Sequence, residues 1–245
     1  MELDPGNPFA PYFAGWCRVS AGNPAEAVTY FQRAIEVDPQ HGWSWLGVGF
    51  SHAELGHFSE ARWSLEKAVA LEKKLPQSPT VGVSGYLGEC LRRMGDPASA
   101  RARCLEGIEA VEKSDHMYRD TFRGICLCVL GRAALDEQDA PAARAAFTQA
   151  AAHLRGRPRA LGGGHLLVQA LAGLSRAGEG PGPYEEAARL FGNRRSFDFS
   201  YLWCCSDDVT LSELSLAARA IGRTKEAESL LDRSLAAGAG TLRVD

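Results

Sequence analysis

The sequence lacks any apolar run long enough to cross a membrane. The longest such stretch, Ile125–Leu130, is far shorter than the roughly 18 residues that a spanning helix needs. The chain also has little net charge, since 27 Lys and Arg residues against 30 Asp and Glu residues give −3. A dedicated nucleic-acid-binding protein shows a basic surface instead. We therefore expect neither a membrane nor a nucleic acid as partner.

A disulfide framework is missing as well. The seven cysteines are odd in number and include no Cys-x-x-Cys motif, so they cannot form a closed set of disulfides. Cys90 and Cys104 lie at apolar positions of helical patterns, which favours free, buried thiols in a reducing compartment. We predict a cytoplasmic location. Only the neighbours Cys204 and Cys205 leave a redox or metal role open, and neither has a further His or Cys at zinc-ligand spacing.

The motifs of common enzyme classes are also absent. The chain has no Gly-x-Ser-x-Gly, no His-Glu-x-x-His and no calcium-binding loop. Its glycine run, Gly162–Gly164, lacks the Gly-Lys-Ser or Gly-Lys-Thr of a phosphate-binding loop, and a helix junction is the simpler interpretation. The sequence therefore predicts no catalytic residue, no metal and no cofactor, and we do not expect an enzyme.

What the sequence does contain is an internal repeat. Small and large apolar residues recur after 34 residues: Gly22, Ala27, Phe31, Ala34 and Pro39 align with Gly56, Ala61, Leu65, Ala68 and Lys73. Looser copies follow at steps of 39 to 44 residues, one of them with Gly131, Ala143 and Phe147. A period of this length is typical of solenoid proteins. Strict alternation of apolar and polar residues is nearly absent, so we expect almost no strand.

This pattern resembles the tetratricopeptide repeat family, in which each repeat is a pair of antiparallel helices. The resemblance implies that the small residues let the two helices pack closely and that the large apolar residue fills the space between repeats. It further implies an all-α, right-handed solenoid of about six helix pairs in one domain over residues 1–245. The expected units are the tail of an upstream repeat at 1–7 and repeats at 8–41, 42–75, 81–114, 124–157, 164–200 and 208–241.

The first residues favour a chain that is part of a longer protein. Glu2–Pro5 matches Glu36–Pro39, the end of a second helix, and an uncapped solenoid end exposes apolar surface. A chance match at a short natural N-terminus is the alternative. The opening run resembles repeats attached to bacterial Ser/Thr kinases, adenylyl cyclases and winged-helix regulators, which implies a regulatory or signalling protein.

The resemblance also assigns a groove, because the first helix of each pair lines the concave surface in this family. The positions that face it are Phe9, Tyr12, Phe13, Trp16, Trp43, Phe50, Tyr86, Glu89, Arg92, Arg93 and Arg132. Aromatic and arginine side chains dominate binding energy at interfaces, so this set suits a peptide with apolar and then acidic residues. Two alternatives stay open: the first aromatic residues pack against an upstream repeat, and the arginines pair with Glu89 and Asp136.

The predicted function is protein–protein interaction, with a protein or a peptide segment as partner, including a segment of the same full-length chain. Exposed aromatic residues also predict a homodimer. The alternative function is a ligand-sensing module that binds a small anion, with the basic residues between the fourth and fifth repeats as its site. These are Arg155, Arg157, Arg159 and His165. A solvated turn is the simpler interpretation of that basic string.

Overall fold

The computed structural model describes residues 6–74, 82–157, 160–193 and 205–238 of the 245-residue chain. Within these residues the chain forms twelve α-helices, one short π-helical segment and no strand. The predicted all-α solenoid fold is therefore confirmed. Glu2–Pro5, Arg159 and Cys204 lie outside the described residues.

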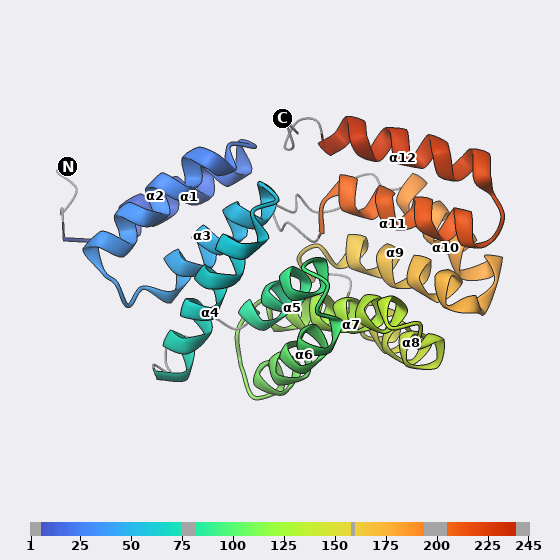
Figure 1. Cartoon of the computed structure of the whole chain (residues 1–245), viewed down its shortest axis with the longest axis horizontal. Coiled ribbons are helices and arrows are strands. Elements are labelled where there is room, and N and C mark those ends of the chain that lie inside the picture. The colour runs from blue at the N-terminus through green and yellow to red at the C-terminus, as the bar shows by residue number, and fades with distance from the viewer. Residues whose placement is uncertain (1–5, 75–81, 158–159, 194–204, 239–245) are drawn as a thin grey trace.

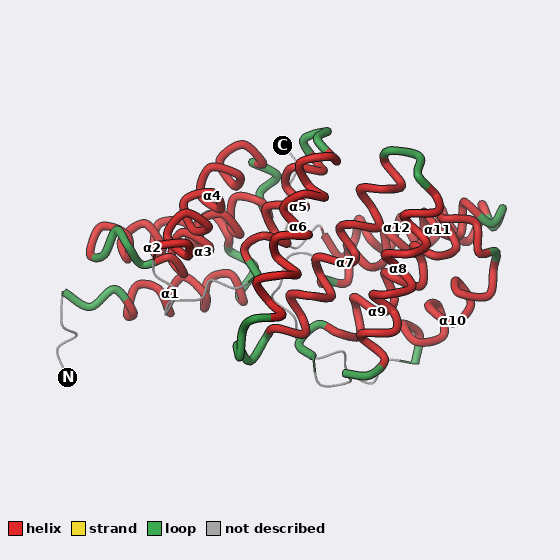
Figure 2. The backbone as a smooth tube through the Cα atoms, turned by 90° about the horizontal axis from the view of Figure 1, so that it is seen from below, coloured by secondary structure: helices red, strands yellow, loops and turns green. Residues whose placement is uncertain are grey.

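The twelve helices form six consecutive antiparallel pairs. The first helices are α1 (Phe9–Ser20), α3 (Gly42–Glu54), α5 (Val83–Arg93), α7 (Arg119–Asp136), α9 (Gly163–Leu174) and α11 (Asp207–Ala220). The second helices are α2 (Pro24–Val37), α4 (Phe58–Lys74), α6 (Pro97–Glu112), α8 (Ala140–Arg155), α10 (Pro181–Gly192) and α12 (Thr224–Gly238). The π-helical segment η1 (Ser175–Glu179) continues α9. Figure 1 shows the pairs following one another along an arc, and Figure 2 shows the same order from below.

Proline and glycine set the helix ends. Pro24 and Pro97 begin α2 and α6, where a missing N–H leaves no helical hydrogen bond unmade. Gly22 and Gly95 follow α1 and α5 with φ of 73° and 84°, the left-handed conformation that commonly ends a helix. In both of these pairs a tight turn therefore joins the two helices and holds them antiparallel.

Neighbouring pairs pack through glycines that receive an aromatic ring. Phe31 of α2 is fully buried between α1 and α3. A Cβ atom placed on Gly15 or on Gly47 would lie 2.6 Å from this ring, so only glycine fits at either position. Phe147 of α8 packs against glycines of α7 and α9 in the same way. The large apolar residue of a second helix thus fills the space between successive first helices.

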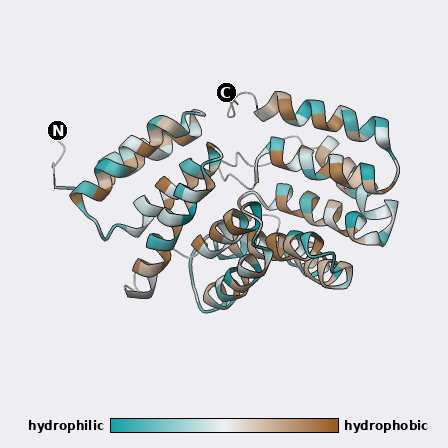
Figure 3. Cartoon of the chain, viewed as in Figure 1, coloured by the Kyte–Doolittle hydropathy of each residue, from teal (hydrophilic) through white to brown (hydrophobic). Residues whose placement is uncertain are grey.

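The buried side chains follow the whole row of helices. One cluster extends from Leu46 in α3 to Leu230 in α12, and a smaller cluster surrounds Phe31. Figure 3 shows hydrophobic and hydrophilic residues alternating around each helix, as expected when one face of a helix is buried. Among the described helices, none combines the length and the apolar character needed to cross a membrane.

Of the six described cysteines, Cys17 is exposed and the other five are buried. Cys205 is one of the buried thiols. Because its neighbour Cys204 lies outside the described residues, a redox or metal role of this pair stays a hypothesis. Cys17 lies on α1 and is exposed, which makes it accessible to reagents.

Candidate peptide-binding groove

A groove of about 550 Å³ lies among the first helices of the N-terminal half, and we call it the aromatic groove. It is lined by Tyr12, Phe13, Trp16, Cys17, Ser20, Trp43, Leu46, Phe50, Tyr86, Tyr118, Phe122 and Leu161. Helices α1, α3, α5 and α7 all contribute, together with residues that precede α7 and α9. The lining is mostly aromatic, so the groove suits apolar side chains.

The floor of the aromatic groove is a chain of ring contacts between helices. The ring centroids of Trp16 and Phe50 lie 5.5 Å apart, and those of Phe50 and Tyr86 lie 5.8 Å apart. Phe50 and Tyr86 are buried, whereas Tyr12 and Trp16 are half-buried and Phe13 is 60% exposed. The buried rings of Phe50 in α3 and Tyr86 in α5 form the floor, while the wall rings, Trp16 among them, keep surface available for a ligand.

The opposite wall comes from the start of α7 and the turn before it. The ring of His116 lies 5.6 Å from both Trp43 and Phe122, and 5.5 Å from Tyr118. Burial lowers the pKa of His116, which keeps its ring neutral at pH 7. This wall is therefore uncharged at neutral pH and continues the aromatic surface of α3.

The structure brings together more than half of the groove residues that the sequence predicts. Those that line the aromatic groove are Tyr12, Phe13, Trp16, Trp43, Phe50 and Tyr86. Phe9 begins α1 outside the lining, with its ring 5.1 Å from His41. The four charged residues of the predicted set lie further along, on α5 and α7.

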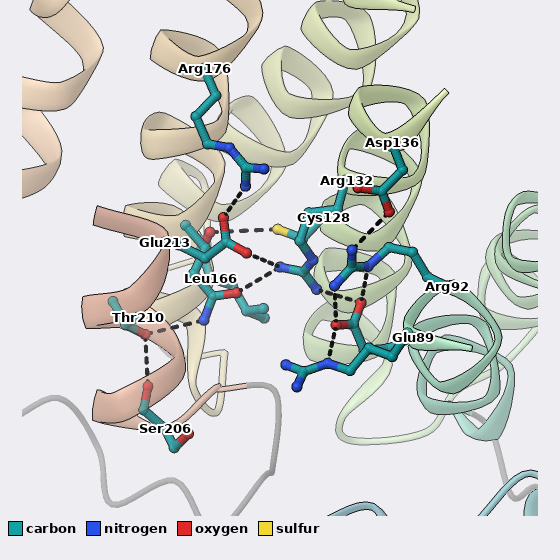
Figure 4. A network of polar contacts seen from close by, with 12 residues as sticks. Glu89, Arg92, Cys128, Arg132, Asp136, Leu166, Arg176, Ser206, Thr210 and Glu213 are labelled. Carbon is teal, nitrogen blue, oxygen red and sulfur yellow. Dashed lines mark hydrogen bonds and ion pairs between the residues drawn. The ribbon is translucent and has the colours of Figure 1, made fainter. Parts of the chain in front are cut away.

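Glu89 is the centre of a group of ion pairs that we call the ionic network (Figure 4). Arg92 donates two hydrogen bonds to its two carboxylate oxygens, at 2.9 and 2.8 Å, and Arg93 donates a third at 3.0 Å. Arg132 of α7 lies 3.3 Å away, and the Glu89 and Arg132 side chains are each only 3% exposed. One buried carboxylate thus forms ion pairs with three guanidinium groups.

The ionic network continues from α7 to the C-terminal pairs. Arg132 donates to Gln169 of α9 at 3.1 Å and lies 4.0 Å from Glu213 of α11. Arg176 of η1 donates to the other oxygen of Glu213 at 2.5 Å. Toward α5, Asp136 accepts a hydrogen bond from Arg92 at 2.8 Å. Side chains from four successive first helices and from η1 are therefore connected.

The opposite charges of the ionic network stabilise one another. Burial alone would disfavour the ionised form of Glu89, but Arg132, Arg92 and Arg93 outweigh it and hold the pKa of this carboxyl well below its ordinary value. Glu89 in turn raises the pKa of Arg132 despite its burial. The guanidinium groups of the predicted groove are thus paired with carboxylates of the same chain, and Arg132 is inaccessible to a partner.

The predicted anion-site residues face different helices. Arg155 donates to both oxygens of Glu186 in α10, at 2.8 and 2.7 Å, and Arg157 donates to Asp120 in α7 at 2.6 Å. His165 is buried, with Nδ1 3.0 Å from Thr210 in α11. The three described residues therefore do not converge on one site. No group of three His, Cys, Asp or Glu residues in the described part of the chain is arranged to hold a metal ion.

Glu54, the last residue of α3, has an unusual environment. Burial and the nearby carboxylate of Asp208 raise the pKa of Glu54 to about 7, although Arg93 opposes the shift. Asp208 belongs to the first turn of α11. Groups from the second and the sixth helix pair are therefore close enough to interact electrostatically.

Among the lining residues that the predicted set lacks, Tyr118, Phe122 and Leu161 lie beyond the first three helix pairs. All three precede or begin a first helix, and α7 starts at Arg119, earlier than the expected repeat boundary at 124. The aromatic spacing of Tyr118 and Phe122, four residues apart, was the available signal, since such residues share one face of a helix. Leu161 offers no comparable signal, because its contact with the groove depends on the turn before α9.

Comparison with known proteins supports the same architecture. Residues 14–79 match the model of the tetratricopeptide repeat family. No curated protein sequence matches the chain.

Several solved structures share the fold. The Cut9–Hcn1 hetero-tetramer of APC/C has a TM-score of 0.60 at 18% identity, over 98% of this chain and 43% of that chain. A Rap protein complexed with competence and sporulation factor has a TM-score of 0.60 at 13% identity, over 95% of this chain and 76% of that chain. NprR in complex with its cognate peptide NprX has a TM-score of 0.62 at 12% identity, over 94% of this chain and 66% of that chain.

The present chain thus spans less than half of the matching Cut9–Hcn1 chain, and at these identities the similarity establishes the fold alone. This similarity agrees with the paired arrangement of the helices described above. The chain is an all-α solenoid, and its residues 14–79 match the tetratricopeptide repeat family.

Proposed function

We propose that the chain is a protein–protein interaction scaffold that holds a peptide segment of its partner in the aromatic groove. The observation that carries this proposal is the groove itself, in which half-buried Tyr12, Trp16 and Trp43 stand over a floor of buried rings. Aromatic side chains in such positions supply most of the energy of protein interfaces. The Rap and NprR structures, determined with a factor and a peptide, support a partner of this kind.

The chemistry of the lining narrows the partner to an apolar segment. Hydroxyl groups of tyrosine and serine and the thiol of Cys17 are the main polar groups of the aromatic groove. Arg92, Arg93 and Arg132 are held by carboxylates of the chain itself, so they offer little uncompensated charge to an acidic segment. The ligand we propose presents two or more large apolar side chains along one face.

The biological setting is also part of the proposal. We place the scaffold in a larger bacterial regulatory or signalling protein of the cytoplasm, with a peptide of another protein or of the same full-length chain as ligand. The fold similarity to Rap and NprR supports this setting. A small-anion sensor is not favoured, because Arg155, Arg157 and His165 face three different helices.

A peptide-display selection on the immobilised chain tests the function. We expect enriched peptides with paired apolar side chains, whose affinity falls at least tenfold in Trp43→Ala and is unchanged in Leu105→Ala. Leu105 is the control, because it is an exposed apolar residue on α6 outside the aromatic groove. Peptides that bind the Trp43→Ala and the unmodified chain equally would contradict the proposal, and so would a selection without enrichment.

Cys17 provides an independent readout of the same site. It lines the aromatic groove and is exposed, whereas the other described cysteines are buried. In a Cys204→Ser background, an alkylating reagent should modify Cys17 first, and a selected peptide should slow that reaction in proportion to its occupancy. A reaction rate that is the same at saturating peptide would place the peptide elsewhere.

A further inference from the structure

A second pocket, of about 560 Å³, lies between α2, α3 and α4, and none of its lining residues belongs to the aromatic groove. We call it the outer pocket, because the second helices α2 and α4 form two of its walls. Ile35 of α2 and Val48 of α3 provide an apolar base. The walls carry two indole rings, Trp45 and Trp63, and two carboxylates, Glu36 and Glu60.

The two indoles form a corner that suits a flat cation. Their centroids lie 5.3 Å apart with the planes at 72°. Trp45 is fixed by a hydrogen bond from its Nε1 to the carbonyl oxygen of Pro39 at 3.0 Å, whereas Trp63 is 52% exposed. The ammonium group of Lys67 already lies 5.5 Å from the Trp63 ring centroid, which shows that this ring accepts a cation at its face.

The carboxylates of the outer pocket have no cationic partner in the part of the chain that the structure describes. Among the described residues, neither Glu36 nor Glu60 is part of an ion pair, in contrast to the neighbouring Glu26 and Glu66, which pair with arginines. The imidazole in the lining is His52, whose pKa is lowered by burial and by His57, although Glu60 opposes the shift.

His52 is therefore neutral at pH 7, so it does not balance the two acidic groups. Its Nδ1 atom is buried and has no hydrogen-bond partner. The outer pocket thus combines two uncompensated carboxylates, an unsatisfied polar nitrogen and two aromatic rings.

We propose that the outer pocket binds an arginine side chain of a partner protein. The guanidinium plane would stack on an indole, and its N–H groups would donate to Glu36 and Glu60. Arginine fits better than lysine because its planar fork both stacks on aromatic rings and pairs with carboxylates. This site is separate from the aromatic groove, so it adds a second point of attachment to the proposed scaffold.

The test uses N-acetyl-arginine-methylamide as the probe, with the matching lysine and norleucine compounds beside it. The chain has five tryptophans, and an NMR correlation spectrum resolves one indole N–H signal for each. We expect the arginine compound to shift the signals of Trp45 and Trp63, with a dissociation constant on the order of a few millimolar. The norleucine compound should leave both signals in place.

Charge-neutral variants identify the carboxylates. Glu36→Gln with Glu60→Gln should weaken arginine binding at least fivefold, and both residues are exposed, so the fold should be retained. Glu26→Gln with Glu66→Gln is the matched control, since it removes the same charge from the same two helices outside the outer pocket. Equal weakening in both variants would reduce the effect to general electrostatic attraction and overturn the proposal.

Other outcomes would also overturn it. Equal shifts with norleucine would indicate an apolar crevice, and equal affinity for the lysine compound would remove the preference for arginine. Shifts at Trp43 and Trp16 would place the compound in the aromatic groove. If the indole N–H signals of Trp45 and Trp63 shift with protein concentration alone, the occupant of the outer pocket is a second copy of the chain. None of these results depends on whether a peptide binds the aromatic groove, so the two proposals can fail separately.

Discussion

Single glycines determine how closely neighbouring helices approach one another. A Cβ atom on Gly47 would lie 2.6 Å from the ring of Phe31, so Gly47→Ala should push α3 away from α2. We expect a loss of about 1–3 kcal/mol in the free energy of unfolding, measured in urea. Gly182→Ala is the control, because a Cβ atom there has no neighbour within 4 Å. Equal stability of the two variants would contradict the packing described here.

Glu54 gives the stability a pH dependence of predictable sign. Burial and Asp208 raise its pKa in the folded chain to about 7, from an ordinary value of 4.5. The folded state therefore binds more protons than the unfolded state between about pH 4.5 and 7. The contribution of Glu54 to the free energy of unfolding is therefore full below about pH 4.5 and is lost as the pH rises through about 7.

Glu54→Gln should remove the loss of stability that occurs as the pH rises through about 7. We expect the variant to be more stable than the unmodified chain by about 1–2 kcal/mol at pH 8, and equal to it at pH 4.5. Urea unfolding at the two pH values measures the difference. Glu228→Gln, an exposed change on α12, should show the same stability difference from the unmodified chain at both pH values. An identical pH profile for Glu54→Gln and the unmodified chain would disprove the assignment.

At the scale of helices, Glu89 is the residue on which the ionic network depends. Glu89→Gln keeps the shape of the side chain but leaves the buried Arg132 without its closest carboxylate. Removing one partner of a buried ion pair costs about 3–5 kcal/mol, and we expect a loss of that size in denaturant unfolding. Glu109→Gln, which breaks an exposed pair with Lys113, should change the stability by less than about 1 kcal/mol. A similar small effect for both would show that the buried pair contributes little.

The helix pairs could be predicted from the sequence because their signals are local. Glycine before a turn and alanine and phenylalanine at repeat spacing are enough to place both helices of a unit. Half of the ionic network is local too, since Arg92 and Arg93 follow Glu89 by three and four residues, a spacing that brings side chains together on a helix. The aromatic wall residues Tyr12 and Trp16 are predictable for the same reason.

The remaining features could not be predicted because they depend on distant residues. Glu213 meets Arg132 only after the solenoid has curved, and nothing near either residue indicates the contact. The burial of Arg132 also depends on α9 and α11 packing beside α7. Tyr118 was outside the expected repeat, because α7 begins at Arg119, before the predicted repeat boundary at 124.

At the scale of the whole molecule, the N-terminal end exposes aromatic surface. Phe9 and Phe13 are 50% and 60% exposed, with their rings stacked 6.3 Å apart. Exposed apolar patches favour association, so we expect the weight-average mass in sedimentation equilibrium to rise with concentration. Phe13→Ser should reduce this rise, whereas Leu235→Ser, on an exposed residue of α12, should not. A single monomeric species at high concentration would refute the prediction.

The two proposed sites share one helix. Trp43 and Phe50 of α3 line the aromatic groove, while Trp45 and Val48 of the same helix line the outer pocket. Residues two positions apart point to different sides of a helix, so α3 separates two surfaces. A partner with both an apolar segment and a basic segment would therefore contact the scaffold on both sides of α3.

The ionic network gives the solenoid two unequal mechanical halves. A repeat protein usually unravels from its ends one unit at a time, because each unit contacts only its neighbours. Here Glu89, Arg132 and Glu213 tie together helices from α5 to α11, whereas the ion pair described for α1 and α2 is the exposed Arg18–Glu26 contact. When the two ends of the chain are pulled apart, α1 to α4 should peel away at low force. The later helices should then resist and give way together.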